Sequence, residues 1–229
     1  MQASRRVSRA VQAALGAMVT LLASISLTPS HADAVDAEAF VAAFGEVCIP
    51  ERLSYEGTVA LAGQAGWTPV MPGANEPFDQ FIEHAETLLQ EEIADEPDFY
   101  HGSDGAWLTR EIGGRPHLLA VSLLLTEFMD TAGCYLYDFA ATEPIDPEPL
   151  TRLLGQPMGY TTDGGDPDYA VDPAELVSMV WGPPPALPRT GDTYLTFIPE
   201  GSPHAARIGF TGLMLKFSTS LPSWEERQQ

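Results

Sequence analysis

Carboxylate side chains gather in two short stretches of the sequence, and carboxylate oxygens are the ligands that hard cations such as calcium prefer. The stretches are EEIADEPDFYHGSDG at residues 91–105 and TDGGDPDYAVD at residues 162–172. The candidate contact residues for a cation or a basic partner are Asp98, His101, Asp104, Asp163, Asp166 and Asp168. Neither stretch matches the calcium loop D-x-D/N-x-D/N-G, so ordinary acidic turns are the competing interpretation.

No recognisable catalytic motif is present in the sequence. No two histidines stand at the spacing of a helical zinc site, and no Gly-x-Ser-x-Gly nucleophile turn occurs. We therefore predict no catalytic residue, assign no metal ligands and expect no cofactor apart from the candidate calcium contacts. The alternative is an envelope hydrolase that uses carboxylates or His101, because a catalytic carboxylate pair is defined by its separation in space.

The first 34 residues have the pattern of a secretory signal peptide. Three arginines at positions 5, 6 and 9 precede an apolar stretch, which ends before the small-residue cleavage pattern Ala32-Asp33-Ala34. Cleavage there leaves a periplasmic or secreted protein without a stable membrane anchor. The paired arginines leave open whether the general secretory route or the twin-arginine route is used.

Two cysteines, Cys48 and Cys134, are the only ones in the chain. A pair of cysteines in an oxidising compartment usually forms a disulfide, and neither residue has a Cys or His neighbour at metal-ligand spacing. We predict a Cys48–Cys134 disulfide. Closing a loop of roughly 85 residues stabilises the fold by about 4 kcal/mol on the chain-entropy estimate.

The chain is strongly acidic, with 11 basic and 32 acidic residues. Removal of the signal peptide takes away Arg5, Arg6, Arg9 and Asp33, so 8 basic and 31 acidic residues remain and the net charge becomes −23. Such a charge repels nucleic-acid phosphates and favours a cationic partner or divalent ions. Solubility, or adaptation to a salty medium, is the competing explanation; Lys216 is the only lysine.

Residues 35–223 have the organisation of a single α+β domain, followed by a frayed polar tail at 224–229. Apolar residues recur at helical spacing in segments 40–48, 54–67 and 77–89. A further short helix is expected at 146–155. Strands are expected at 106–112, 115–128, 134–139, 175–182, 192–198 and 206–218, with a tight turn at Gly113-Gly114 between the first two. We predict an α+β fold with N-terminal helices packed on an antiparallel sheet of about five to six strands. The unbroken apolar run at 118–125 favours a strand that is covered on both faces, but the sequence leaves open whether helices cover one face of the sheet or both.

In layout the chain resembles uncharacterised single-disulfide proteins secreted by Gram-negative bacteria. The segments that carry the resemblance are FGEVCIPE at 44–51, GQAGW at 63–67, GCYLYDF at 133–139 and MVWG at 179–182. The resemblance implies an envelope location and one domain, and it brings no functional residues with it.

Together these features predict a non-catalytic binding protein of the periplasm, with a basic protein as its partner. The acidic surface and the stiff proline-rich segment 183–188 are the candidate contact regions, and a rigid connector is the competing interpretation of the latter. Besides the hydrolase, a second alternative is a small apolar-ligand binder whose pocket is lined by Trp67, Trp107 and Trp181.

Overall fold

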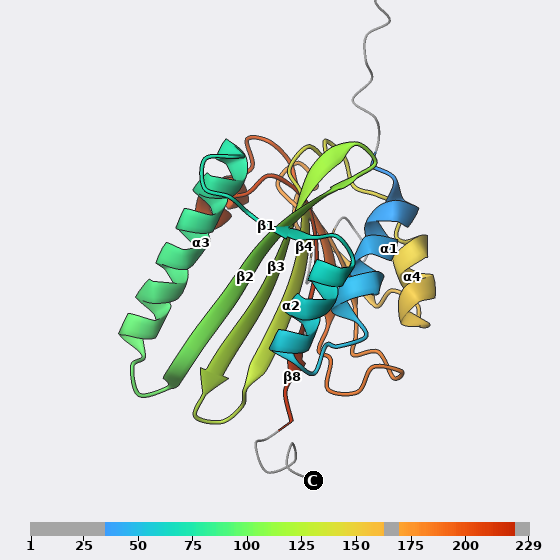
Figure 1. Cartoon of the computed structure of the whole chain (residues 1–229). Coiled ribbons are helices and arrows are strands. Elements are labelled where there is room, and N and C mark those ends of the chain that lie inside the picture. The colour runs from blue at the N-terminus through green and yellow to red at the C-terminus, as the bar shows by residue number, and fades with distance from the viewer. Residues whose placement is uncertain (1–34, 163–169, 223–229) are drawn as a thin grey trace, which may run out of the picture. The chain divides into compact units, whose positions relative to one another are not determined.

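The computed structural model describes residues 35–162 and 170–222, so the signal peptide and the polar tail that the sequence predicts lie outside it. In these ranges an antiparallel sheet of eight strands has the order β1-β2-β3-β4-β8-β7-β6-β5 (Figure 1). The strands are β1 (Thr68–Pro69), β2 (Tyr100–Ile112), β3 (Arg115–Thr126), β4 (Thr131–Asp138), β5 (Tyr160–Thr161), β6 (Val177–Trp181), β7 (Thr193–Ile198) and β8 (Gly212–Ser220).

The α+β class is confirmed, but the expected five to six strands are too few, because the described chain forms eight. The additional strands, β1 and β5, contain two residues each, stand at the two edges of the sheet, and pair with β2 and β6. Two residues show no alternation of apolar and polar side chains, so the sequence carries no signal for such strands. The expected turn between β2 and β3 is confirmed, with Gly113 and Gly114 at φ 60° and 78°.

Three helices cover one face of the sheet, called the α1 face here: α1 (Ala37–Cys48), α2 (Tyr55–Gln64) and α4 (Glu148–Leu154). Phe40 and Phe44 of α1 are fully buried, and the Phe44 ring meets Phe217 of β8 edge-on at 5.2 Å between ring centroids. Ser54 caps α2 by accepting a hydrogen bond from the amide of Gly57. The α1 face therefore holds the larger apolar core.

Two helices lie on the opposite face, called the α3 face: α3 (Glu76–Asp95) and α5 (Pro203–Ile208). The helices therefore cover both faces of the sheet, and α3 stands across the sheet from α1, α2 and α4 (Figure 1). Phe81 of α3 packs in an aromatic cluster with Tyr137 of β4 and with Phe210. Apolar residues on both sides of the sheet require a cover on both faces.

The last strand begins later than the sequence suggests. Residues 206–218 are expected to form one strand, but α5 occupies the first part of that segment and β8 starts at Gly212. Ser202 accepts a hydrogen bond from the amide of His204, and Gly209 ends the helix in the left-handed region at φ 73°. A serine followed by proline, with a glycine seven residues after the serine, is the local pattern of a short capped helix.

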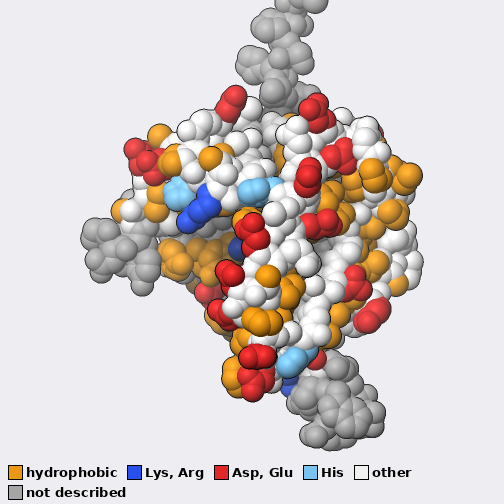
Figure 2. All heavy atoms as spheres, turned by 90° about the vertical axis from the view of Figure 1, so that its left-hand side faces the viewer, with side chains coloured by type: hydrophobic (Ala, Val, Ile, Leu, Met, Phe, Trp, Pro, Cys, Tyr) orange, Lys and Arg blue, Asp and Glu red, His pale blue; other side chains and the backbone are white. Residues whose placement is uncertain are grey.

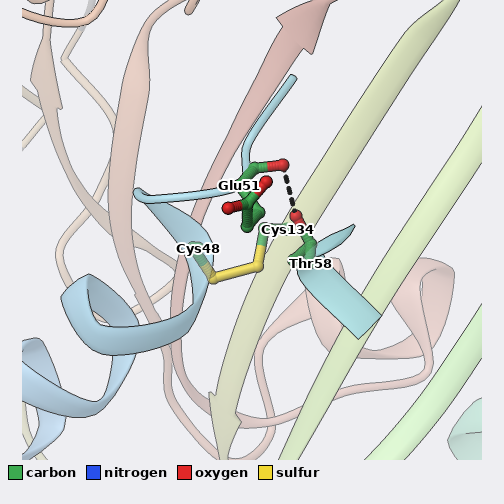
Figure 3. The surroundings of a disulfide bond; sticks show 4 residues. All are labelled: Cys48, Glu51, Thr58 and Cys134. Carbon is green, nitrogen blue, oxygen red and sulfur yellow. Dashed lines mark hydrogen bonds between the residues drawn. A yellow bond between two sulfur atoms is a disulfide. The ribbon is translucent and has the colours of Figure 1, made fainter. Parts of the chain in front are cut away.

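The predicted disulfide is present and joins the end of α1 to β4 (Figure 3). Beside it, the Thr58 hydroxyl of α2 donates a hydrogen bond to the carbonyl oxygen of Glu51 at 2.9 Å. Both cysteines are buried in the core of the α1 face. The disulfide thus fixes the helical layer on that face to an interior strand of the sheet.

The proline-rich segment 183–188 does not project from the fold as a stiff extended arm. It turns back on itself, with the amide of Leu187 donating to the carbonyl of Pro184 at 2.9 Å. Pro184 is buried, and Leu187 packs against the core of the α1 face. These contacts favour the rigid connector over the docking segment.

Candidate functional site

The candidate acidic residues are not brought together into one site. Asp98 is exposed in the turn after α3, and His101 and Asp104 are exposed on β2. The three other candidates, Asp163, Asp166 and Asp168, lie outside the described residues. Across 35–162 and 170–222, no three His, Cys, Asp or Glu side chains come close enough to hold a metal ion. The described half of this candidate set therefore adds no support for a calcium site.

An enclosed polar cluster lies on the α1 face, where β3 and β4 pair. His117 Nε2 and a guanidinium nitrogen of Arg115 lie 3.4 Å and 2.8 Å from the same carboxylate oxygen of Asp138. The side chains of His117 and Asp138 are 1% and 0% exposed, and Phe40 packs against the imidazole ring at 5.7 Å between centroids. Because His117 and Asp138 are enclosed and the Arg115 side chain is 21% exposed, we interpret the cluster as part of the core and not as a binding site.

A row of three side chains on the α3 face is the strongest candidate site. Tyr135 of β4 and Tyr194 of β7 are both register partners of Lys216 on β8, which lies between them. The Lys216 Nζ atom is 6.0 Å from the ring centroid of Tyr135 and 5.3 Å from that of Tyr194. We call these three residues the Tyr–Lys–Tyr row. Each ring faces the ammonium group at a distance where cation–π attraction operates.

Lys216 is half-buried, and no carboxylate among the described residues lies within ion-pair distance of it. Burial lowers the pKa of Lys216 from its ordinary value, because removal of water penalises the charged ammonium form. An ammonium group that is partly removed from water without a counter-charge lowers the stability of the folded state. Such a group is a candidate for ligand binding, since a bound anion would supply the missing charge.

The strand pattern explains why Lys216 points to this face. Leu215 and Phe217, its neighbours on β8, belong to the core of the α1 face, and alternate side chains of a strand point to opposite faces. Lys216 is the only lysine of the chain and interrupts the apolar run GLMLKF. That interruption is the signal in the sequence that could have identified Lys216. The two tyrosines could not be identified in this way, because the pairing of three separate strands places them beside Lys216.

Local packing holds the Tyr135 ring in place. A Cβ atom added at Gly133 would lie 2.5 Å from Tyr135 Cε2, so the ring occupies the space that the glycine leaves. The Tyr135 ring also lies nearly parallel to that of Tyr137, 7° between planes and 6.4 Å between centroids. Burial, and then the charge of Asp192, raise the pKa of Tyr194, so its phenol stays protonated.

A cleft of about 680 Å³ lies between α3 and strands β2, β3 and β4, and Tyr135 forms part of its wall. Figure 2 views this side of the molecule and shows a recess beside α3 with hydrophobic side chains in it. Volumes of about 300–1,000 Å³ are usual for small-molecule sites. The apolar lining residues include Phe81, Ala85, Leu89, Trp107, Ala120 and Leu124, and the lining also contains the acidic residues Glu86, Glu92 and Asp104. The cleft and the Tyr–Lys–Tyr row therefore adjoin each other through Tyr135.

Of the three tryptophans expected to line an apolar pocket, one does so. Trp107 lines the cleft, whereas Trp67 and Trp181 are 2% and 0% exposed within the core of the α1 face. Among the described residues, no helix is long and apolar enough to cross a bilayer. Comparison of the chain with protein-family models, with curated proteins and with solved structures found no match.

Proposed function

We propose that the protein is exported to the periplasm and there binds a small anionic molecule at the Tyr–Lys–Tyr row, without catalysis. The half-buried, unpaired ammonium group of Lys216 is the observation that carries this proposal. A carboxylate placed on Lys216 would form an ion pair in a partly desolvated setting, where charge-assisted hydrogen bonds are strong. The flanking rings of Tyr135 and Tyr194 favour a ligand whose body is flat or apolar.

The net charge of the protein restricts which anions suit this site. The processed chain carries a net charge of −23, which repels ligands with several negative charges. A ligand with a single negative charge meets the least repulsion and can still neutralise Lys216. We therefore expect monoanions to bind in preference to dianions of similar size.

Replacing Lys216 with methionine is expected to weaken ligand binding and to stabilise the protein. With benzoate as probe, loss of a charge-assisted interaction of about 1.5–3 kcal/mol weakens affinity at least tenfold. Because burial lowers the pKa of Lys216, the charged form is disfavoured in the folded state, and its removal is expected to raise the melting temperature by about 2–4 °C. Calorimetric titration and thermal unfolding of the oxidised, processed protein measure the two effects.

The matched control for this experiment is Arg152→Met, which removes one positive charge from the exposed surface of α4. Benzoate affinity of this variant should equal that of the wild type, and benzamide, the uncharged analogue, should not bind either protein. Equal benzoate affinity in Lys216→Met and wild type would exclude the row as the site. Failure of wild type to bind benzoate or other small carboxylates at millimolar concentration would refute the proposal itself.

A second candidate function is binding of a basic protein segment, and a groove on the outer flank of α3 favours it. This hollow of about 950 Å³ has Val70, Ile82 and Trp107 in its apolar floor. Its acidic residues are Asp79, Glu83, Glu86 and Glu91. Figure 2 shows acidic side chains following the helix. An acidic rim around an apolar floor suits a partner segment that combines lysine or arginine with apolar side chains.

The double variant Glu83→Gln/Glu91→Gln tests this groove with an amphipathic peptide of lysine and leucine as probe. We expect the variant to bind the peptide about tenfold more weakly than the wild type in low salt, and both affinities to fall as sodium chloride is raised. The control Glu143→Gln/Glu200→Gln changes two exposed carboxylates outside the groove. Peptide binding that is insensitive to salt would remove the electrostatic argument for a basic partner.

A further inference from the structure

We propose that the ligand is an amphiphilic monocarboxylate, whose carboxylate pairs with Lys216 and whose apolar chain passes over Tyr135 into the cleft beneath α3. This inference rests on the proposed function and specifies the class of ligand. It is carried by the continuity between the half-buried Lys216, which has no carboxylate partner among the described residues, and a largely apolar cleft beside it.

The sheet register sets the path of the chain. Lys216 pairs with Tyr135, Tyr135 pairs with Ala120 of β3, and Ala120 pairs with Trp107 of β2, so these four residues form one line across four neighbouring strands. Strands lie about 4.8 Å apart, so the line from the ammonium group to the indole spans roughly 14 Å. Only the first position of that line is charged, which matches a molecule with one charged end.

Small side chains leave the floor of the cleft low. The next line along the strands contains Gly105, Ser122 and Gly133, which pair in register and lie on the same face as Tyr135. A Cβ atom added at Gly105 would meet no heavy atom within 4 Å, so open space stands above this glycine. Gly105, Ser122 and Ala120 form a shallow channel beside the Trp107 ring, and the Tyr135 ring, which covers Gly133, closes the other side of this channel.

The C-terminal half of α3 supplies an apolar roof that the sheet does not fill. The buried residues of α3 are Phe78 and Phe81, both in its first two turns. Further along the helix, Ala85, Leu89 and Ile93 continue the apolar stripe but stay only half-buried. An apolar chain in the cleft would complete the packing of this stripe. The hydrophobic effect would then favour binding by a free energy proportional to the apolar area removed from water.

The carboxylates at the rim of the cleft disfavour a second charged group on the ligand. Glu86 accepts a hydrogen bond from the indole of Trp107 at 3.0 Å, and Glu92 accepts one from the phenol of Tyr100 at 2.5 Å. Both carboxylates lie near the far end of the channel, where a second anionic group would be repelled. The geometry therefore selects one anionic head at Lys216 and an uncharged tail.

Titration with butanoate, octanoate and dodecanoate, each below its micelle concentration, tests the inference on the oxidised, processed protein. We expect the dissociation constant to fall with chain length by up to about fourfold per methylene group buried. Gly105→Leu places a side chain in the open space of the cleft at an ordinary backbone conformation. This variant should bind butanoate as the wild type does and should lose the gain from longer chains.

The outcomes separate the inference from the proposed function. The proposal of an amphiphilic ligand would be wrong if affinity depended on Lys216 but not on chain length. It would also be wrong if Gly105→Leu left the affinity for all three acids unchanged. Either result would still be consistent with an anion site at Lys216. Binding of none of the three acids would overturn both. If Gly105→Leu does not fold, Leu89→Gln on α3 makes the cleft polar from its opposite wall, and the same loss of chain-length dependence is expected.

Discussion

Replacing Asp138 with asparagine is expected to lower the free energy of unfolding by about 3–5 kcal/mol, the usual cost of removing one partner from a buried ion pair. The Asp138 carboxylate is 0% exposed and lies against both Arg115 and His117. Asparagine keeps the shape of the side chain but removes the charge, which leaves the guanidinium group without its counter-charge and the buried imidazole with a weaker partner. Urea unfolding of the oxidised protein measures the difference.

The same substitution at an exposed position is the control. Asp98→Asn in the turn after α3 should change the free energy of unfolding by no more than about 0.5 kcal/mol, as surface substitutions usually do. If Asp138→Asn proved as mild as this control, the cluster would contribute hydrogen bonds alone and its charges would not matter to stability.

Acid should remove the difference between wild type and Asp138→Asn. Burial alone would raise the pKa of Asp138, but the hydrogen bond and charge of His117, the amide of Ala140 and the charge of Arg115 together lower it. A carboxyl group whose pKa is lower in the folded state stabilises the protein at pH values above about 3.9, its value in the unfolded chain. That contribution is lost as the pH falls through the lower pKa of the folded state. Unfolding curves for the two proteins should therefore converge in strong acid.

The helices and most strands of this fold could be predicted from the sequence because their signals are local. The apolar stripe from Phe40 to Cys48 marks α1, Ser54 marks the start of α2, and the pair Gly113-Gly114 marks the turn between the two longest strands. Each signal depends on residues that are neighbours in the chain, so no knowledge of the tertiary structure is needed.

The sequence indicates that both faces of the sheet are covered, but it does not indicate which helices lie on each face. Leu118 and Ala120 of β3 face the α3 side, whereas Leu119 and Val121 face the α1 side, and all four are buried. The unbroken apolar run of β3 indicates that both faces are covered, and this is confirmed. The run does not tell which helix covers which face, and the two-residue edge strands likewise depend on tertiary contacts alone.

The candidate site could not be predicted from the sequence, because its residues lie on three different strands. Tyr135, Tyr194 and Lys216 come from three strands whose order in the sheet, β4-β8-β7, is not the order in the chain. A one-residue change of register would move Lys216 to the other face, so the row exists only with the observed pairing. The acidic stretches are easy to recognise because their residues are neighbours in the sequence. The residues of the Tyr–Lys–Tyr row are far apart in the sequence and are brought together by strand pairing.

The fold separates its stabilising devices from its candidate binding surface. The disulfide, the Asp138 cluster and the larger core all belong to the α1 face, while the cleft, the unpaired Lys216 and the half-buried stripe of α3 belong to the α3 face. Binding sites commonly carry groups that reduce stability, and the rest of the fold offsets that cost. The α1 face is therefore where substitutions should affect unfolding most and ligand affinity least.

Removal of the disulfide by Cys48→Ala/Cys134→Ala is expected to reduce the free energy of unfolding by about 4–5 kcal/mol on the chain-entropy estimate. The two cysteines are 86 positions apart, so the unfolded chain gains a large amount of conformational freedom when the link is removed. Alanine suits both positions because the cysteines are buried among apolar side chains. Urea unfolding in parallel with the oxidised and the chemically reduced wild type measures the loss.

The reduced wild type serves as the internal control, since it keeps both cysteine side chains and lacks only the link. If reduced wild type and the double alanine variant lose the same stability, the effect belongs to the link and not to the sulfur atoms' packing. Stability equal to that of the oxidised protein in both would mean that α1 holds its place on β4 through Phe40, Phe44 and Val47 alone, with no contribution from the covalent bond. These side chains form a core that exists only in the folded state, whereas the disulfide acts mainly by restricting the unfolded chain. We therefore expect the two contributions to the free energy of unfolding to add, so that full stability requires the disulfide.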